Sequence, residues 1–487
     1  MTLIPLGYVA AWSISVGPHE AWQLLVRPRI GELLTNTVSL TLATMASTAT
    51  LGVGLAFLVE RTDLPGRQLF HGLLVAPLAV PAFVHSYAWV SLAPWAIGFS
   101  GAWLVITLSY FPLVYLPAVA ALRGMDPALE ETAWALGHSR ARTLFSVLGP
   151  QLRPALLGGV LLVGLHLLAE FGALQLLRFP TFTTAIYDQY GSTYNGSAAT
   201  MMAGVLVLLC MLLLLADLRL RGRRRFARVG TGTARKVTPL RLRSARWPTA
   251  FLVGGILGLA LGVPVYALAH WLRVGASTHF PLADLAAATG STLGLALIGA
   301  LATTTLALPV AWLAVRVRGR FATVVERSTY IANALPGIVV GLALVTVSLS
   351  VVPATYQTTL LLVAAYVILF MPRAVVSVRA GIEQAPPRLD EVSHALGLSP
   401  LATLRRVTLP VIAPHLGAGA ALVFLAIATE LTATLMLSPI GTHTLATEFW
   451  SASSDLRYGA AAPYALLLVA VSVPATLLLV KREKAEP

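Results

Sequence analysis

ETAWALGHSRARTLFSVLGPQLRP (residues 131–154) and EVSHALGLSPLATLRRVTLPVIAP (residues 391–414) are two copies of one polar, glycine-broken stretch in a very apolar chain. The copies begin 260 residues apart, and ten of their 24 aligned positions are identical. The identical pairs are Glu131/Glu391, Ala135/Ala395, Leu136/Leu396, Gly137/Gly397, Ser139/Ser399, Thr143/Thr403, Leu144/Leu404, Val147/Val407, Pro150/Pro410 and Pro154/Pro414. The repeat predicts a chain built from two related halves.

The composition is typical of a membrane protein. The chain has 487 residues, of which 57% are hydrophobic and 11% are charged, whereas soluble domains carry about 25% charged residues. At about 20 apolar residues per crossing, this length holds about a dozen transmembrane helices. The one cysteine, Cys210, lies in an apolar run, so a disulfide framework or a thiolate metal site is excluded.

Apolar runs of helical length fall into two sets of six. The runs are 2–17, 36–58, 70–94, 100–122, 154–177 and 199–218, then 248–272, 288–315, 330–352, 358–378, 412–437 and 460–480. An even number of crossings per half gives both halves one orientation, so the repeat is parallel. We therefore expect an all-α membrane protein of about 12 transmembrane helices, organised as a first repeat at 1–218, a basic linker at 219–247 and a second repeat at 248–487.

The net charge of +14 is distributed unevenly. If the segments after crossings two, four and six of each half are cytoplasmic, the other side keeps only Arg27, Arg29, Arg178, Arg273 and Arg457. The cytoplasmic set of the second half is Arg316, Arg318, Arg320, Arg327, Arg373, Arg379, Arg388, Arg405, Arg406, Lys481, Arg482 and Lys484. This asymmetry predicts that both termini are cytoplasmic. The basic linker is then expected to lie along anionic lipid headgroups rather than on nucleic acid.

The quoted stretch predicts a short helix, a glycine bend and a second helix. Asp126 and Pro127 fit the N-cap and first position of a helix, and Gly137 fits a left-handed C-cap. Ser139 and Ser399 fit new N-caps after the bend. Ten helical residues span about 15 Å, which is too short to cross a bilayer. Two equivalent protrusions suit a two-fold symmetric cytoplasmic partner; the alternative is a helix lying on the headgroups.

The doubled pattern resembles the EAA loop of type I ABC importer permeases. The residues that match the motif are Glu131, Ala133, Gly137 and Pro150 in the first copy and Glu391, Ser393, Gly397 and Pro410 in the second. The copies depart from the family pattern at Gly149 and Ser393. The resemblance implies that coupling helices at about 127–145 and 387–405 dock onto two copies of an ATPase subunit.

No G-x-x-x-x-G-K-[ST] motif occurs in the chain, which has only three lysines. The chain therefore lacks a P-loop for ATP. We expect a non-catalytic subunit that binds no cofactor itself, with ATP and Mg²⁺ held by the partner ATPase.

A finer resemblance is to the fused permeases of ferric-iron importers. It rests on LAEFGALQLLRFPTFTTAIYDQY from Leu168, NALPGIVVGLAL from Asn333 and ATELTATLMLSPIGTHTLATEFWSASSDLRYGAAAPYALL from Ala428. It implies a bacterial inner-membrane permease that receives ferric iron from an extracytoplasmic solute-binding protein. Fused thiamine and phosphonate permeases share the architecture and remain alternatives.

Two intramembrane carboxylates, Glu170 and Glu430, are also 260 residues apart. Related by a pseudo-two-fold axis, they would face each other across a central pathway, and ionisable residues at membrane depth are functional candidates. Carboxylate oxygens suit a hard cation such as Fe³⁺, in transient contact, and His166 lies one turn before Glu170. The alternative is that each glutamate stabilises a helix end.

Other candidates for the pathway are His85 and Asn333, although such residues often satisfy backbone groups freed near proline. Two outer loops, one with Tyr187, Asp188, Tyr190 and Tyr194 and one with Glu448 and Asp455, are candidate docking surfaces for the solute-binding protein. A secondary carrier is a remote alternative, because ERTDLPGR from Glu60 only loosely resembles a carrier loop. A membrane-embedded enzyme is disfavoured by the absence of HExxH and G-x-S-x-G.

Overall fold

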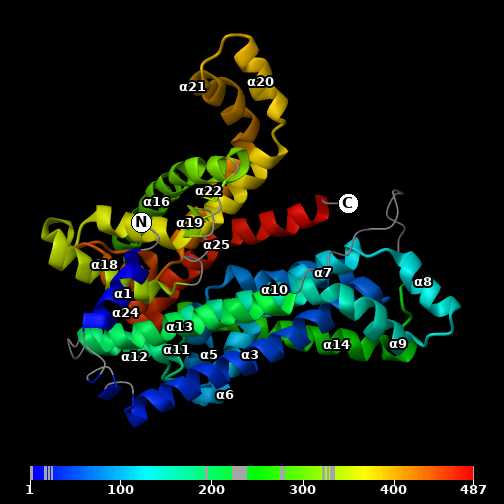
Figure 1. The fold of residues 1–487 in the computed structure, drawn as a ribbon. Helices are drawn as coiled ribbons and strands as arrows, with labels where there is room; N and C mark the ends of the chain where they lie inside the picture. The colour runs from blue at the N-terminus through cyan, green and yellow to red at the C-terminus, as the bar shows by residue number, and fades with distance from the viewer. Residues whose placement is uncertain are drawn as a thin grey trace.

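The computed structural model describes residues 4–485 apart from 16–18, 20–21, 24–25, 192–195, 222–238, 275–279, 318, 321–323, 326–327 and 330–334. The described residues form helices and no β-strand, and they contain an isolated bridge between Thr62 and Leu240. Figure 1 shows a helical body from which two units, α8–α9 and α20–α21, protrude at separate corners. The predicted all-helical class is confirmed.

Eight spans in the described residues are long and apolar enough to cross a membrane. Their helices are α3 (Pro28–Arg61), α6 (Gly98–Tyr110) with α7 (Pro112–Gly124), α10 (Gly149–Ala169), α13 (Gly196–Arg221), α14 (Arg246–Leu257) with α15 (Val263–Val274), α16 (Leu282–Arg316), α19 (Thr359–Gln384) and α22 (Leu409–Ala428). Each corresponds to one of the twelve predicted crossings.

The other four predicted crossings contain shorter or bent helices. They correspond to α1 (Ile4–Ser15), the pair α4 (Arg67–Val75) and α5 (Ala82–Leu92), α18 (Gly337–Val351) and α25 (Tyr458–Ala485). At about 1.5 Å per residue, the 12 residues of α1 and the 15 residues of α18 do not reach across a ~30 Å hydrocarbon core. The count of twelve crossings therefore stays a prediction.

The predicted crossing at 70–94 contains two helices rather than one continuous helix. Helices α4 and α5 meet at an angle of 92° across a 3₁₀ turn at Ala76–Ala79. Pro77 lies in this turn and Pro81 is the N-cap of α5, and each proline removes a backbone N–H and disfavours helix in the residue before it. The bend places α5 inside the protein, with eight consecutive buried residues from Ala82 to Trp89.

The fifth crossing of each half is broken. Helix α10 ends at Ala169 and α11 (Gly172–Leu176) follows, while α22 ends at Ala428 and α23 (Thr432–Leu437) follows. The predicted outer loops contain the helices α12 (Phe182–Gly191) and α24 (Leu445–Ser454). Of their candidate residues, Tyr194 lies outside the described residues.

Both outer helices begin with the same stabilising contact. The N–H of Phe182 donates to Thr37 Oγ1 at 3.2 Å, and the N–H of Leu445 donates to Thr292 Oγ1 at 2.8 Å. A helix start inside a membrane protein needs such partners for its free N–H groups. The shared device indicates that the two halves fold alike.

Helices of the two halves also pack against each other. Helix α1 packs on α13 of its own half and on α18 of the other, while α15 packs on α5 of the first half and on α25 of its own. The Tyr87 hydroxyl on α5 donates to the carbonyl of Tyr458 at 2.6 Å. Helices α1, α5 and α18 are thus covered partly by the other half, so the repeats form one packed body.

Candidate functional site

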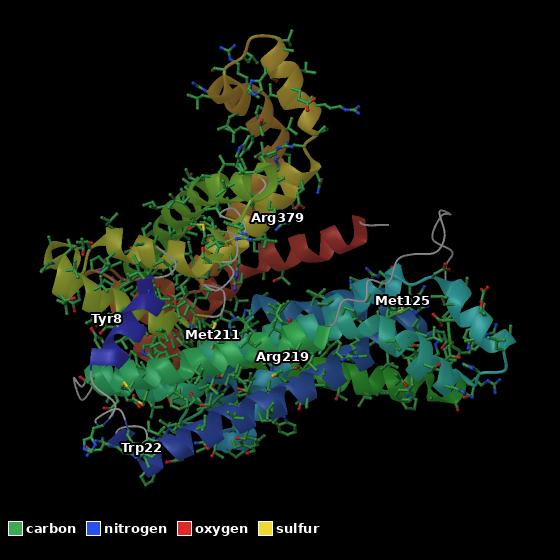
Figure 2. All side chains as sticks on the ribbon, in the orientation of Figure 1. Tyr8, Trp22, Met125, Met211, Arg219 and Arg379 are labelled. Carbon is green, nitrogen blue, oxygen red and sulfur yellow. The ribbon has the colours of Figure 1, made fainter. Side chains whose placement is uncertain are left out.

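The first feature shared by both halves is a protruding helix–glycine–helix unit (Figure 1). Helix α8 (Pro127–Ala135) ends at Gly137, and α9 (Arg140–Thr143) follows; α20 (Pro387–Ala395) ends at Gly397, and α21 (Pro400–Thr403) follows. The two glycines have left-handed φ angles of 81° and 80°. This confirms the predicted shape of the quoted stretch, and Figure 2 labels Met125 where the chain enters the first unit.

The glycine bend closes with the hydrogen bonds of a Schellman motif in each copy. In the first, the N–H of His138 donates to Ala133 O and that of Gly137 to Trp134 O, both at 2.9 Å. In the second, Leu398 donates to Ser393 O at 3.0 Å and Gly397 to His394 O at 2.9 Å. The left-handed glycine aligns both bonds, so it fixes the angle between the two helices of a unit.

The predicted helix caps are also present. Asp126 Oδ1 accepts the N–H of Ala128 at 3.0 Å, and Ser139 Oγ and Ser399 Oγ accept from Arg142 and Ala402, both at 3.3 Å. The position and orientation of each short helix are therefore encoded locally.

A π-helical turn then leads each unit into the membrane. The turns are Leu144–Leu148, closed by Gly149 N–H to Leu144 O, and Leu404–Thr408, closed by Leu409 N–H to Leu404 O. Pro150 and Pro410 follow directly, and a proline clashes with the carbonyl four residues earlier in a regular helix. The wider turn accommodates the proline, so each unit continues into α10 or α22 without a break.

The motif residues of the units divide into buried and exposed positions. Ala133 and Ser393 are buried, and the Ser393 hydroxyl donates to Leu389 O at 2.7 Å, so the second copy's departure from the family pattern is accommodated within its own helix. Glu131, Glu391, Pro150 and Pro410 are exposed. Leu136 and Leu396 are 74% and 77% exposed.

A buried ion pair, which the sequence did not reveal, anchors the first unit. Arg61 Nη1 at the end of α3 lies 2.9 Å from Glu130 Oε1, with 4% and 10% of the two side chains exposed. Arg61 Nη2 also donates to Leu122 O at 3.0 Å. Burial raises the pKa of the Glu130 carboxyl above its ordinary value, and the neighbouring Arg61 charge opposes that rise. Glu130 therefore ties the unit to α3.

The second shared feature is a cavity of about 360 Å³ between the halves. Glu170, His166 and Tyr110 line it from the first half, and Glu430 and Arg373 line it from the second. The two glutamates predicted to share a pathway therefore border one space.

Both glutamates also hold a helix start. Glu170 Oε2 accepts from the Tyr110 hydroxyl at 2.6 Å and Oε1 from Ala173 N–H at 3.0 Å. Glu430 accepts from Ala433 N–H at 2.8 Å, Thr434 N–H at 2.9 Å and the Thr434 hydroxyl at 2.6 Å. Each carboxylate thus begins α11 or α23, which is the stabilising role left open above, while remaining at the cavity wall.

The remaining pathway candidates lie in different places. His166 Nδ1 donates to Leu162 O at 2.8 Å, which leaves Nε2 of a neutral ring as an acceptor. His85 is fully buried and does not line the cavity; its ring nitrogens lie 3.2 Å from Val80 O and 2.9 Å from Ala260 O. Asn333 lies outside the described residues.

Arg373 lies at the cavity, although it is not among the pathway candidates predicted from the sequence. The sequence grouped it with the cytoplasmic loop cations, but it lies within α19 and lines the cavity, one residue after Pro372. Among the described residues, no group of three or more His, Cys, Asp or Glu side chains has the geometry to hold a metal ion.

Comparison with known proteins agrees with the two-repeat organisation. The family model for "Binding-protein-dependent transport system inner membrane component" matches residues 30–225 and 304–481. The Fe(3+)-transport system permease protein FbpB 2 of Haemophilus influenzae is 37% identical over 479 residues, covering 98% of this chain and 95% of that protein.

More distant relatives are also permeases by name. The ferric transport system permease protein FbpB of Actinobacillus pleuropneumoniae is 23% identical over 493 residues, covering 93% of this chain and 71% of that protein. The sulfate transport system permease protein CysT of Escherichia coli is 29% identical over 189 residues, 35% of this chain and 67% of that protein. Because the family model matches both halves and most of the chain, this protein belongs to the binding-protein-dependent transport system inner membrane components.

Proposed function

We propose that this chain is the permease subunit of an ATP-driven importer that moves ferric iron into the cytoplasm. The observation that carries the proposal is the match at 37% identity, over nearly the full length of both chains, to a protein named as an Fe(3+)-transport permease. The exposed helix–glycine–helix units and the cavity shared by the two halves support the same function.

ATP hydrolysis belongs to partner subunits in this proposal. Two ATPase copies, which hold ATP and Mg²⁺, dock on α8–α9 and α20–α21, where Leu136 and Leu396 offer equivalent apolar contacts. These units lie on the cytoplasmic side, as do both termini, because the basic residues gather there. The solute-binding protein docks on the opposite side, near α12 and α24.

Transport follows from alternating access to the cavity. Closure of the ATPase pair moves α8–α9 and α20–α21, and the continuous π turns pass this movement into α10 and α22. Those helices end at Glu170 and Glu430, at the cavity wall. Carboxylate oxygens are suitable transient ligands for a hard cation, and a permease must release its cargo.

Uptake into proteoliposomes tests the proposal. The vesicles contain this chain with its ATPase, and the solute-binding protein is added outside with radiolabelled Fe³⁺, thiamine or a phosphonate. We expect ATP-dependent accumulation of iron alone. Accumulation of an organic substrate without iron would contradict the iron assignment and leave the family unchanged.

A further inference from the structure

The cavity wall carries one arginine, which has no ion-pair partner among the described residues. The guanidinium of Arg373 lines the cavity and lies 5.4 Å over the ring of Phe370. No hydrogen bond or ion pair joins it to any residue that the structure describes. A guanidinium has five N–H donors and no acceptor, so Arg373 presents unused donors to the space between the halves.

The two carboxylates on the same wall accept hydrogen bonds from the protein and keep their negative charge. Glu170 accepts two hydrogen bonds and Glu430 accepts three, from backbone N–H groups and hydroxyls of their own surroundings. Neither forms an ion pair with Arg373 in the described structure. The wall therefore offers two carboxylates and one guanidinium, and the guanidinium is the group whose N–H donors the described residues leave unused.

Comparison of the two repeats shows that Arg373 is a difference between the halves. Positions 260 apart line the cavity in pairs, including Tyr110 with Phe370 and Glu170 with Glu430. The partner of Arg373 is Leu113, which lines the same cavity. The scaffold thus tolerates an apolar residue at this position, and the arginine is not needed to build the wall.

We infer that the cavity receives ferric iron as a complex with oxygen-donor anions, whose outward negative charge binds Arg373. The two carboxylates attract a bare trivalent cation, but the guanidinium beside them works against its binding and would have no favourable partner on such an ion. An anionic ligand on the metal supplies that partner, and a guanidinium pairs well with carboxylate or phosphate oxygens. The inference rests on the proposed function, because it names the chemical form of the same cargo.

The size of the cavity and the relatives agree with this assignment. A volume of about 360 Å³ is room for about ten water molecules, which exceeds what a bare ion needs and fits an ion with small ligands. One relative of part of this chain is named as a sulfate permease. A related scaffold is therefore associated with an oxyanion.

Double-label uptake with the complete importer tests the inference. Proteoliposomes with the ATPase inside and the solute-binding protein outside are offered ⁵⁵Fe³⁺ with either [³²P]phosphate or [¹⁴C]citrate, in buffer free of bicarbonate. We expect one anion to accumulate with iron at a constant ratio and only with ATP. Iron entering with neither label would overturn the inference while leaving the proposed iron transport in place.

Three variants separate charge from folding. Arg373→Leu, which copies Leu113, should lower uptake at least tenfold while binding-protein-stimulated ATP hydrolysis persists; Arg373→Lys should lose less than threefold. Arg379→Leu is the matched control, because Arg379 (labelled in Figure 2) lies on the same helix outside the cavity and pairs with Glu383. Wild-type uptake by Arg373→Leu would overturn the inference. Wild type that accumulates neither iron nor anion would instead contradict the proposed function.

Discussion

Replacing Gly137 and Gly397 together with valine tests whether the left-handed bends transmit movement. Both glycines have φ near +80°, and a Cβ added at either would meet nothing within 4 Å. The effect of valine is therefore backbone strain alone, about 1–2 kcal/mol for an L-residue in this conformation. Since 1.4 kcal/mol is tenfold, each native bend should lose about 5- to 30-fold in relative population.

The assay compares transport with ATP hydrolysis in the reconstituted importer. We expect the double valine variant to insert normally and to hydrolyse ATP, while uptake falls about tenfold or more because the units no longer hold their angle. Asparagine at both positions should keep most of the uptake, since it tolerates the left-handed region. Gly124→Val is the matched control, because Gly124 is equally open but has no positive φ.

Two results would refute this reasoning. Wild-type uptake by the double valine variant would show that the bends are not needed for coupling. An equal loss in the asparagine and valine variants would show that the left-handed conformation is not what matters.

Two further predictions concern acidic side chains. Glu130→Ala leaves Arg61 buried without its counter-charge, which should cost about 3–5 kcal/mol and expose the first unit to protease; unchanged proteolysis would contradict the anchoring role. Glu430→Gln should lower the unfolding temperature in detergent more than Glu170→Gln. Three donors point at the two Glu430 oxygens, so in the glutamine variant at least one donor would face the amide nitrogen and lose its acceptor. Leaving that donor without a hydrogen bond should cost about 1–3 kcal/mol of stability. At Glu170 the Tyr110 hydroxyl can accept from that nitrogen instead, and an equal shift in both variants would refute this difference.

The local features of the protruding units could be predicted from sequence because their causes are local. In the first unit, three residues satisfy nearby backbone groups: the glycine that follows the helix, the serine two positions later and the acid before the proline. The structure has the hydrogen bonds of all three in place. The bend at 76–81 was also predictable in principle, since Pro77 and Pro81 mark it. The apolar run continues through both prolines, so the hydropathy pattern alone did not indicate the bend.

The breaks at Glu170 and Glu430 could not be predicted in this way. Apolar residues continue on both sides, and a single glutamate hardly changes the average hydropathy. The helix stops there because distant groups, such as the Tyr110 hydroxyl and the Thr183 hydroxyl that donates to Glu170 O at 2.7 Å, satisfy the groups that a regular helix would use. The same holds for Arg61 and Glu130, which only the folded chain brings together.

Because the two halves are fused in one chain, the cavity can carry an arginine on only one of its two walls. In a homodimer, both walls have the same sequence, so a substitution in one wall appears in both. An arginine at the position of Arg373 would then be accompanied by a second arginine at the position of Leu113. In one continuous chain the walls diverge independently, and they differ at Leu113 and Arg373 and at His166 and Ala426 while both keep glutamate. A cargo with a negative ligand shell on one side and a metal centre on the other needs such an uneven wall. The repeat preserves the helix–glycine–helix shape at 131–154 and 391–414, and we propose that the asymmetry of the cavity wall supplies the selectivity.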